Sequence, residues 1–123
     1  MASLEALQIG RIVWAEIADR NGICKQRPAI IVSSTDDAGV LTVVAVTSRV
    51  PNSLPDDHVL LPWHPQGHPR TGLNRKSAAV CSWLSQIAAS DILNVAGIVP
   101  GVELLAILTK ISATMTTYSL SFL

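Results

Sequence analysis

Ala29-Ile30-Ile31-Val32 and Val40-Leu41-Thr42-Val43-Val44-Ala45-Val46-Thr47 are the two runs that decide the fold of this 123-residue chain. Both are apolar and rich in β-branched residues, which is the pattern of strands buried on both faces of a sheet. Between them lies Asp36-Asp37-Ala38-Gly39, a segment of residues that favour turns. The two runs are therefore predicted to pair as an antiparallel hairpin at the centre of a sheet.

The rest of the chain continues the β pattern on both sides of this hairpin. Further apolar runs predict strands over residues 9–17, 58–61, 77–84 and 96–99. Asn21-Gly22 predicts a hairpin turn after the first of these, because both residues tolerate positive φ. Residues 48–77 are rich in Pro, His, Gly and Asn and predict long loops. One helical turn capped by Ser90 is predicted at residues 90–93.

The C-terminal third predicts one amphipathic helix, which starts after Pro100 and runs from Gly101 to about Met115. The three- and four-residue spacing of apolar residues places its buried face at Val102, Leu105, Leu108 or Ala106, and Ile111. Of the nine basic and nine acidic residues in the chain, only three fall after residue 76. This segment is therefore either a core helix with a buried tail or a contact surface for a second subunit or a partner.

Composition sets the broad class of the protein. Hydrophobic residues make up 49% of the chain and charged residues 15%. These values exclude disorder and predict a single domain over residues 1–123, with a core over about 9–115 and an apolar tail at 116–123. The net charge is zero, so binding to nucleic acid needs a local basic patch. The sequence shows neither a membrane-spanning run nor a signal peptide, and we expect a cytoplasmic protein.

The usual metal and cofactor motifs are missing from the sequence. It contains no phosphate-binding glycine loop, no Cys-x-x-Cys and no His-Glu-x-x-His, so we expect no cofactor and no metal. His58, His64 and His68 are spread through a Pro-rich region. Their spacing gives no geometric support for a metal site or for a general base.

The polar ends of the central hairpin are the first candidate site. Pro28 fixes the entry to its strand and pushes Arg27 toward an extended conformation. If the two central runs pair, the start of the first lies beside the end of the second, so Arg27 and Thr47 are predicted to be neighbours. A guanidinium beside a hydroxyl suits a phosphodiester, because both groups donate hydrogen bonds to phosphate oxygens. The alternative is an ordinary surface arginine and a threonine that merely favours β structure.

The second candidate site is the loop over residues 64–76. It contains three basic residues and no acidic one, namely Arg70, Arg75 and Lys76. Such a run can track phosphates, although it can equally be a solvated loop. Trp63 either stacks on a base or packs against the sheet, whereas Trp14 and Trp83 are predicted to be core residues.

Several motifs, taken in order, resemble those of the PemK/MazF toxin family. They are Gly10-x-Ile12-Val13-Trp14, Asn21-Gly22…Arg27-Pro28-Ala29-Ile30-Ile31-Val32, Val44-Ala45-Val46-Thr47-Ser48, Thr71-Gly72-Leu73…Ser77, and Gly97-x-Val99 ahead of the final helix. The resemblance runs from about Gly10 to Ile111. It implies a small SH3-like barrel of the PemK/MazF/CcdB type, mainly β with a C-terminal helix, that forms a homodimer.

The same resemblance implies a function. It is that of a metal-independent, sequence-selective endoribonuclease that cleaves single-stranded RNA and is inhibited by a cognate antitoxin, with operator DNA contacted only through the antitoxin. The family's catalytic pair falls on Arg27 and Thr47. We expect Arg27 to stabilise charge on the phosphorus and Thr47 to orient the phosphate. Substrate-binding roles are expected for Lys25, Pro28, Ser48, Arg49, Arg70, Arg75 and Lys76.

Two alternatives stay open at this point. A gyrase-poisoning toxin such as CcdB has the same kind of barrel without nuclease activity, and an inactive family member would bind only its antitoxin and the operator complex. Many relatives carry an acidic residue, Gln and Arg after the Thr-Gly-Leu segment. Here the corresponding stretch is Val80-Cys81-Ser82-Trp83-Leu84-Ser85-Gln86, which lacks the arginine. The RNA sequence preference of relatives therefore does not carry over.

Overall fold

The structure is a computed structural model that describes the backbone of residues 7–120 and the side chains of residues 7–113. Residues 121–123, the end of the predicted apolar tail, lie outside the described backbone. Within it the chain forms one sheet followed by a helix, with the elements β1 (Arg11–Ala18), β2 (Cys24–Ile31), β3 (Val40–Thr47), β4 (His58–Leu61), β5 (Ser77–Ala88), β6 (Asn94–Ile98) and α1 (Gly101–Leu120). The prediction of a mainly β fold with a C-terminal helix is confirmed.

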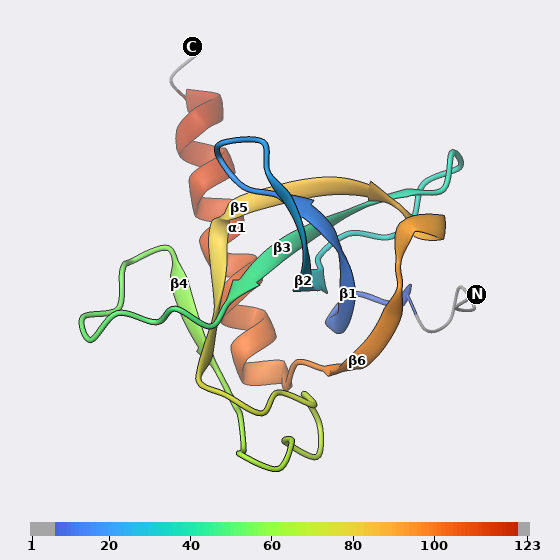
Figure 1. Ribbon diagram of the computed structural model, residues 1–123. Coiled ribbons are helices and arrows are strands. Elements are labelled where there is room, and N and C mark those ends of the chain that lie inside the picture. Colours follow the sequence, from blue (N-terminus) through green and yellow to red (C-terminus); the bar gives the residue numbers. More distant parts are fainter. Residues whose placement is uncertain (1–6, 121–123) are drawn as a thin grey trace.

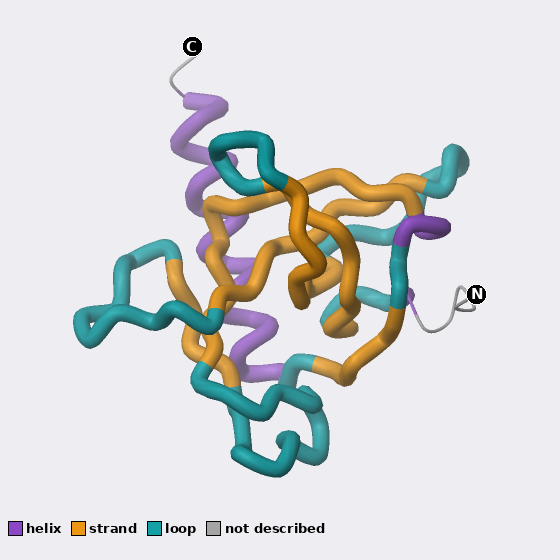
Figure 2. The backbone as a smooth tube through the Cα atoms, in the orientation of Figure 1, coloured by secondary structure: helices purple, strands orange, loops and turns teal. Residues whose placement is uncertain are grey.

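The sheet curls around its own core (Figure 1). Its strands all pair antiparallel in the order β4-β5-β3-β2-β1-β6. The sheet has the curvature of a small barrel but is not closed, because the pairings described leave β4 and β6 as its two edges. Helix α1 lies along one side of the sheet, against β4 and β5 (Figure 2).

Two apolar clusters occupy the two faces of the sheet. The first cluster includes Ile12, Ile30 and Val44 and packs against α1, whereas the second includes Ile31 and Val43. Successive residues of a strand point to opposite faces, so the same strands supply both clusters. Burial on both faces explains why β3 is apolar along nearly its whole length.

The two hairpin turns are built alike, each with an aspartate at its first position and a glycine at its fourth. Oδ1 of Asp19 accepts hydrogen bonds from the N–H groups of Asn21 and Ile23, at 2.8 and 3.0 Å. Asp36 does the same in the turn before β3. Gly22 and Gly39 have φ of 79° and 80°, values that a glycine adopts without strain. These side-chain contacts fix the register of β2 against both neighbours.

Helix α1 buries the predicted Ala106 and Ile111 against the core, but not the predicted Val102 and Leu105. Around the fully buried Ile107, the residues that pack on the first cluster are Leu104, Ala106 and Ile111. Val102 and Leu105, predicted to be buried, are 81% and 67% exposed. The prediction was wrong because apolar residues surround the first turns of this helix, so their spacing does not define one face. No helix in the described part of the chain is long and apolar enough to cross a membrane.

Strand β5 is longer than predicted and carries a bulge. Val44 of β3 pairs with Leu84, but Val46, two residues on, pairs with Ala79. Residues 80–83 of β5 therefore stand opposite the single residue Ala45 of β3, three more than a regular ladder has, although Val80 still pairs with His58 of β4. A bulge bends a strand and re-aims its side chains, and this one brings Ser82 and Trp83 to the wall of a pocket described below.

The connection from β5 to β6 differs from the predicted helical turn capped by Ser90. It contains a single 3₁₀ turn at Ala89–Asp91, and the capping position is Ala88, which makes no side-chain hydrogen bond. The predicted Ser90 cap is therefore wrong, since Ser90 lies inside the turn. Strand β6 begins at Asn94, two residues before the predicted start.

Two glycines hold the loop before β5 against β6. A Cβ on Gly97 would lie 2.5 Å from the carbonyl oxygen of Thr71, and one on Gly72 would lie 2.6 Å from that of Ala96. The backbones approach this closely because neither residue has a side chain. The N–H of Ile98 donates to the Arg70 carbonyl oxygen at 2.8 Å, which pins the loop further.

Candidate functional site

Arg27, in the middle of β2, and Thr47, the last residue of β3, lie just beyond the paired part of these two strands. The ladder between these strands pairs Ala29 with Ala45, and two residues further along the same register the facing positions are 27 and 47. Alternation along each strand puts both side chains on the face of the second cluster, which contains Ala29 and Ala45. This is the arrangement that pairing of the two central runs requires.

The guanidinium of Arg27 is held by three groups. Nε donates to the Ile17 carbonyl oxygen at 3.3 Å, and Nη2 lies 4.0 Å from Oδ2 of Asp19. The group also lies over the ring of Trp83, 4.9 Å from its centre. Only 22% of the side chain is exposed. Arg27 is therefore pre-positioned, with donor capacity left for an incoming anion.

The Asp19 carboxylate beside Arg27 is held in its charged form. Its pKa is lowered first by the hydrogen bond from the Ile23 N–H, and further by the Asn21 N–H and the positive charge of Arg27. The turn that fixes Asp19 thus also fixes the counter-charge of Arg27. An anion that approaches Arg27 has to compete with this carboxylate.

The hydroxyl of Thr47 is oriented by the chain that follows it. Its Oγ1 accepts a hydrogen bond from the N–H of Arg49 at 3.1 Å. A hydroxyl carries one proton and two acceptor positions, so this contact leaves the proton free to donate. The Thr47 side chain is half-buried. It is arranged to give a hydrogen bond to an oxygen of a bound group.

Both residues line a pocket of about 480 Å³, which we call the Thr47 pocket. Its wall also contains Pro28, Ser48, Arg49 and Arg75, all named from the sequence. The charged residues of the wall are three arginines, with no carboxylate among them. Three other sequence-predicted residues lie on the surface outside this wall, namely Lys25, Arg70 and Lys76.

Trp14 is the residue of this pocket that sequence reasoning missed. It was predicted to be buried in the core, but it is 37% exposed and contributes to the wall of the Thr47 pocket. It lies on the same face of β1 as the exposed Glu16, opposite the face on which Val13, Ala15 and Ile17 are buried. Asn74 also lines the pocket without a signal in the sequence that would have marked it.

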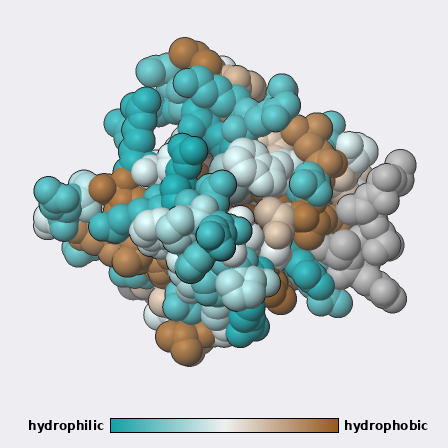
Figure 3. Space-filling view, turned by 60° about the horizontal axis from the view of Figure 1, so that its bottom comes forward, coloured by the Kyte–Doolittle hydropathy of each residue, from teal (hydrophilic) through white to brown (hydrophobic). Residues whose placement is uncertain are grey.

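The loop over residues 64–76 is held by internal hydrogen bonds and is not a loose, solvated segment. Nδ1 of His68 accepts hydrogen bonds from the N–H groups of Arg70 and Thr71, at 3.1 and 3.3 Å. The buried Thr71 hydroxyl donates to the Pro62 carbonyl oxygen at 2.9 Å. These contacts present Arg75 to the pocket. Figure 3 turns this loop toward the viewer, and the visible surface is mostly hydrophilic with separate hydrophobic patches.

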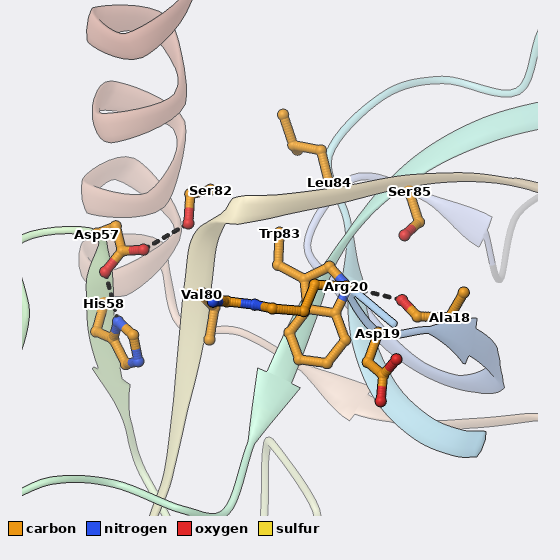
Figure 4. A pocket seen from close by; sticks show the side chains of 10 residues that line it. All are labelled: Ala18, Asp19, Arg20, Asp57, His58, Val80, Ser82, Trp83, Leu84 and Ser85. Carbon is orange, nitrogen blue, oxygen red and sulfur yellow. Dashed lines mark hydrogen bonds and ion pairs between the residues drawn. The ribbon is translucent and has the colours of Figure 1, made fainter. Parts of the chain in front are cut away.

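A second pocket of about 510 Å³, which we call the His58 pocket, lies on the other side of Arg27. Asp19 and Trp83, the two side chains that contact the Arg27 guanidinium, belong to its wall. Arg20 extends across the front of Trp83, and His58 stands at the opposite end beside Asp57 (Figure 4). Arg27 thus belongs to the wall of one pocket and contacts the wall of the next.

Neither pocket brings together the side chains that would bind a metal ion. Among the described residues, no three side chains of His, Cys, Asp or Glu lie close enough together to hold a metal ion. The histidines of the Pro-rich region are instead hydrogen-bonded locally: Nδ1 of His64 accepts from the Gln66 N–H, and Nδ1 of His58 contacts Asp57.

Comparison with known proteins assigns the family. The family model of PemK-like, MazF-like toxins of type II toxin–antitoxin systems matches residues 8–115, nearly the whole described chain. The chain therefore belongs to this toxin family. A comparison with curated proteins gives no match.

Solved structures of MazF-type proteins share the fold. A chain of the MazE–MazF complex from Deinococcus radiodurans is 19% identical, with 88% of this chain and 93% of that chain covered and a TM-score of 0.65. The Mycobacterium tuberculosis toxin MazF-mt6 is 20% identical, with 86% and 96% covered and a TM-score of 0.62. An endoribonuclease in complex with its cognate antitoxin, from a mycobacterial species, is 14% identical, with 88% and 93% covered and a TM-score of 0.63.

Proposed function

We propose that this protein is a metal-independent endoribonuclease toxin that cleaves single-stranded RNA. The observation that carries the proposal is the facing pair of Arg27 and Thr47 in a pocket whose charged residues are all arginines. A pocket lined by positive charge attracts a polyanion and repels cations. Membership of the toxin family and the fold shared with an endoribonuclease support the same activity.

RNA brings its own nucleophile, the 2′-hydroxyl, so the protein needs only to align it and to stabilise the charge that develops. Arg27 binds the scissile phosphate and stabilises the negative charge on its oxygens as the 2′-oxygen attacks. Thr47 donates its free proton to a non-bridging oxygen and sets the phosphate's orientation. The 5′-oxygen leaves, and the products are a 2′,3′-cyclic phosphate and a 5′-hydroxyl.

The flanking nucleotides follow the two pockets on either side of Arg27. Arg49 and Arg75 bind backbone phosphates in the Thr47 pocket, with Pro28 and Ser48 completing its wall. The half-exposed indole of Trp14 offers a surface on which a base stacks. Lys25, Arg70 and Lys76 lie outside the pocket and act on the RNA at longer range.

The proposed partners are inferred from the family and from the exposed apolar residues of α1. We propose a homodimer, because Val102 and Leu105 lie one turn apart on α1 and are 81% and 67% exposed. A cognate antitoxin inhibits the toxin by occupying the arginine-lined pocket in place of RNA. A structurally similar endoribonuclease also forms a complex with its cognate antitoxin. Operator DNA is contacted only through the antitoxin.

The test is incubation of the purified chain with a long RNA in EDTA, followed by mapping of the fragment ends. EDTA removes divalent ions, so cleavage in its presence needs no metal. We expect fragments that end in a 2′,3′-cyclic phosphate and begin with a 5′-hydroxyl. Arg27→Ala is expected to lower the rate at least about 100-fold, the loss typical of removing an oxyanion donor. Thr47→Val, which removes only the hydroxyl, is expected to cost about tenfold.

Thr42→Val is the matched control, because Thr42 is on the same strand and outside both pockets. It should cleave at the parental rate. Cleavage by Arg27→Ala at the parental rate would contradict the assignment. Trapping of gyrase on DNA without any RNA cleavage would instead support the CcdB-like alternative.

A further inference from the structure

The side chains of Asp57, His58 and Ser82 form one hydrogen-bonded array at the end of the His58 pocket (Figure 4). Oδ2 of Asp57 accepts a hydrogen bond from the Ser82 hydroxyl at 2.5 Å, and Oδ1 lies 2.7 Å from Nδ1 of His58. The Cys81 N–H also donates to the Asp57 carbonyl oxygen at 2.6 Å, which continues the β4–β5 pairing one residue beyond His58 and Val80. Asp57 is thus fixed through both its side chain and its main chain.

The charge state of Asp57 settles which nitrogen of His58 carries a proton. The Ser82 hydroxyl, and next the contact with His58, hold the pKa of Asp57 below its usual value. An ionised carboxylate only accepts hydrogen bonds, so Nδ1 of His58 is the donor. In the neutral ring, Nε2 then carries the lone pair.

Nε2 of His58 points away from Asp57 toward the side of the pocket on which Val80 and Trp83 lie (Figure 4). None of the hydrogen bonds described for residues 7–113 involves this nitrogen. The ring itself is held firmly, since only 14% of the side chain is exposed. The pocket therefore has an oriented base at one end and, beyond Trp83, the guanidinium of Arg27.

The pocket has the size of a ligand site. Its volume of about 510 Å³ falls within the range of about 300–1,000 Å³ that small-molecule sites occupy, which is enough for one nucleotide. The phosphate bound by Arg27 lies in the Thr47 pocket, and we place the ribose that carries it as its 3′-phosphate past Trp83, in the His58 pocket. The 2′-hydroxyl is next to that phosphate, so it would lie on the His58 side.

We propose that His58 is the general base of the cleavage reaction and that Asp57 and Ser82 are the residues that position it. This inference rests on the function proposed above and adds the group that removes the proton. Nε2 takes the proton from the 2′-hydroxyl while the 2′-oxygen forms a bond to phosphorus. The bond from phosphorus to the 5′-oxygen breaks, and that oxygen takes a proton from water. His58 then returns its proton to water, so the enzyme ends in its starting state.

The groups around His58 define the expected pH dependence. They are Asp57 beside it, Ser82 on β5, and Asp19 and Arg20 across the pocket on the β1–β2 turn. From α1, Lys110 donates to the main-chain oxygen of Asp56. A general base acts only when it is unprotonated, so the cleavage rate should fall as the pH is lowered.

The decisive variant is His58→Asn. The amide nitrogen of Asn takes the place of Nδ1 and still donates to Asp57, but nothing replaces Nε2. We expect the single-turnover cleavage rate to fall about 100-fold or more, the typical contribution of general base catalysis. Binding of a 2′-O-methyl RNA, which cannot be cleaved, should stay within about twofold of the parent, because the array is preserved. His64→Asn is the matched control and should cleave normally, since His64 lines neither pocket.

Asp57→Asn tests the positioning role. Its amide would donate to Nδ1 and force the proton onto Nε2, so the rate should fall with little change in RNA affinity. The acid limb of the pH–rate profile should disappear in His58→Ala, and added imidazole should restore part of its rate.

The outcomes separate the two proposals. If His58→Asn cleaves within about twofold of the parent while Arg27→Ala is inactive, His58 is not the base and the nuclease assignment stands. If His58→Asn weakens RNA binding as much as it slows cleavage, His58 is a binding residue and the inference is wrong. If the parent cleaves no RNA, both proposals fail. Thermal unfolding of each variant checks that it is folded.

Discussion

The guanidinium of Arg27 on β2 lies 4.9 Å from the centre of the Trp83 ring on β5. The indole nitrogen of Trp83 in turn donates to the Ala18 carbonyl oxygen at 3.0 Å, so the ring is fixed from the opposite edge. The two strands are not neighbours in the sheet, since β3 lies between them. The curl of the sheet brings them together, and Trp83 thereby sets the position of the arginine that we assign to the phosphate.

Replacing Trp83 should therefore slow RNA cleavage, because Arg27 loses the ring that positions its guanidinium. A cation–π contact contributes about 0.5–1 kcal/mol at a partly exposed site, so Trp83→Leu is expected to lower the single-turnover rate about two- to fivefold. Trp83→Phe keeps a ring under the guanidinium and should lose less. Single-turnover rates of both variants provide the comparison, and equal rates for the two would show that the ring face is not what holds Arg27.

Arg75 should contribute to the salt dependence of RNA binding. It lies in the wall of the Thr47 pocket, whereas the neighbouring Lys76 does not. Arg75→Ala is expected to reduce the slope of log affinity against log salt by about one, the value for one phosphate contact. Lys76→Ala should change it less. Fluorescence anisotropy with a 2′-O-methyl RNA over a series of salt concentrations measures both slopes, and an unchanged slope for Arg75→Ala would remove this residue from the RNA site.

The Asp57 array should make part of the stability depend on pH. The pKa of Asp57 is lowered in the folded protein, first by the Ser82 hydroxyl and then by His58. Such a carboxyl stabilises the fold above its unfolded pKa of about 3.9, and the contribution is lost as the pH falls through the lower folded value. Asp57→Asn should therefore be less stable than the parent at about pH 6, and the difference should shrink at about pH 3.

Urea unfolding at the two pH values measures this difference in the free energy of unfolding. Asp37→Asn is a suitable control because Asp37 is an exposed residue of the turn before β3. A destabilisation by Asp57→Asn that is equally large at both pH values would mean that the carboxylate charge is not its source.

Gly97 should not tolerate a side chain. A Cβ at this position would lie 2.5 Å from the Thr71 carbonyl oxygen, and the backbone there cannot turn aside as a flexible side chain would. Gly97→Ala is expected to destabilise the fold by about 1–3 kcal/mol, the usual cost of overpacking. RNA binding should weaken too, because the displaced loop carries Arg75. Gly101→Ala is the control, since a Cβ there meets no atom within 4 Å. Urea unfolding distinguishes the two variants.

The exposed apolar residues of α1 should be needed for dimer formation. We expect the parent to sediment as a dimer and the double variant Val102→Asp/Leu105→Asp to sediment as a folded monomer. Leu93→Asp, which removes a 57%-exposed leucine from the β5–β6 connection, should remain dimeric. A double variant with the parental sedimentation coefficient would place the dimer contact elsewhere on the molecule.

The sequence predicted the parts of the site that depend on local pairing. The limits of β3 and β4 are the predicted ones, because turn residues and prolines bound both runs. The facing positions of Arg27 and Thr47 follow from one hairpin, and an Asp-x-x-Gly turn fixes its register. Local chemistry of this kind can be read from a short stretch of chain.

The rest of the site depends on contacts between distant segments. Asp57 and Ser82 are 25 residues apart and meet only because β5 bulges between Ala79 and Leu84, an irregularity that no local pattern marks. Trp14 shares its face of β1 with the exposed Glu16, whereas Val13, Ala15 and Ile17 on the other face are buried. Hydrophobic spacing along one strand indicates neither a bulge in a distant strand nor which face a distant element covers.

The hydrogen bonds described for the ten-residue segment from Ser48 to Asp57 lie toward its two ends. At one end the Arg49 N–H donates to Thr47, and at the other the main chain of Pro55, Asp56 and Asp57 accepts from His58, Lys110 and Cys81. Residues 51–54 between these contacts are exposed. Insertions and substitutions can therefore accumulate in this stretch without moving the Thr47 or Asp57 side chains, which makes it the place where the chain can vary in length at least cost to either pocket.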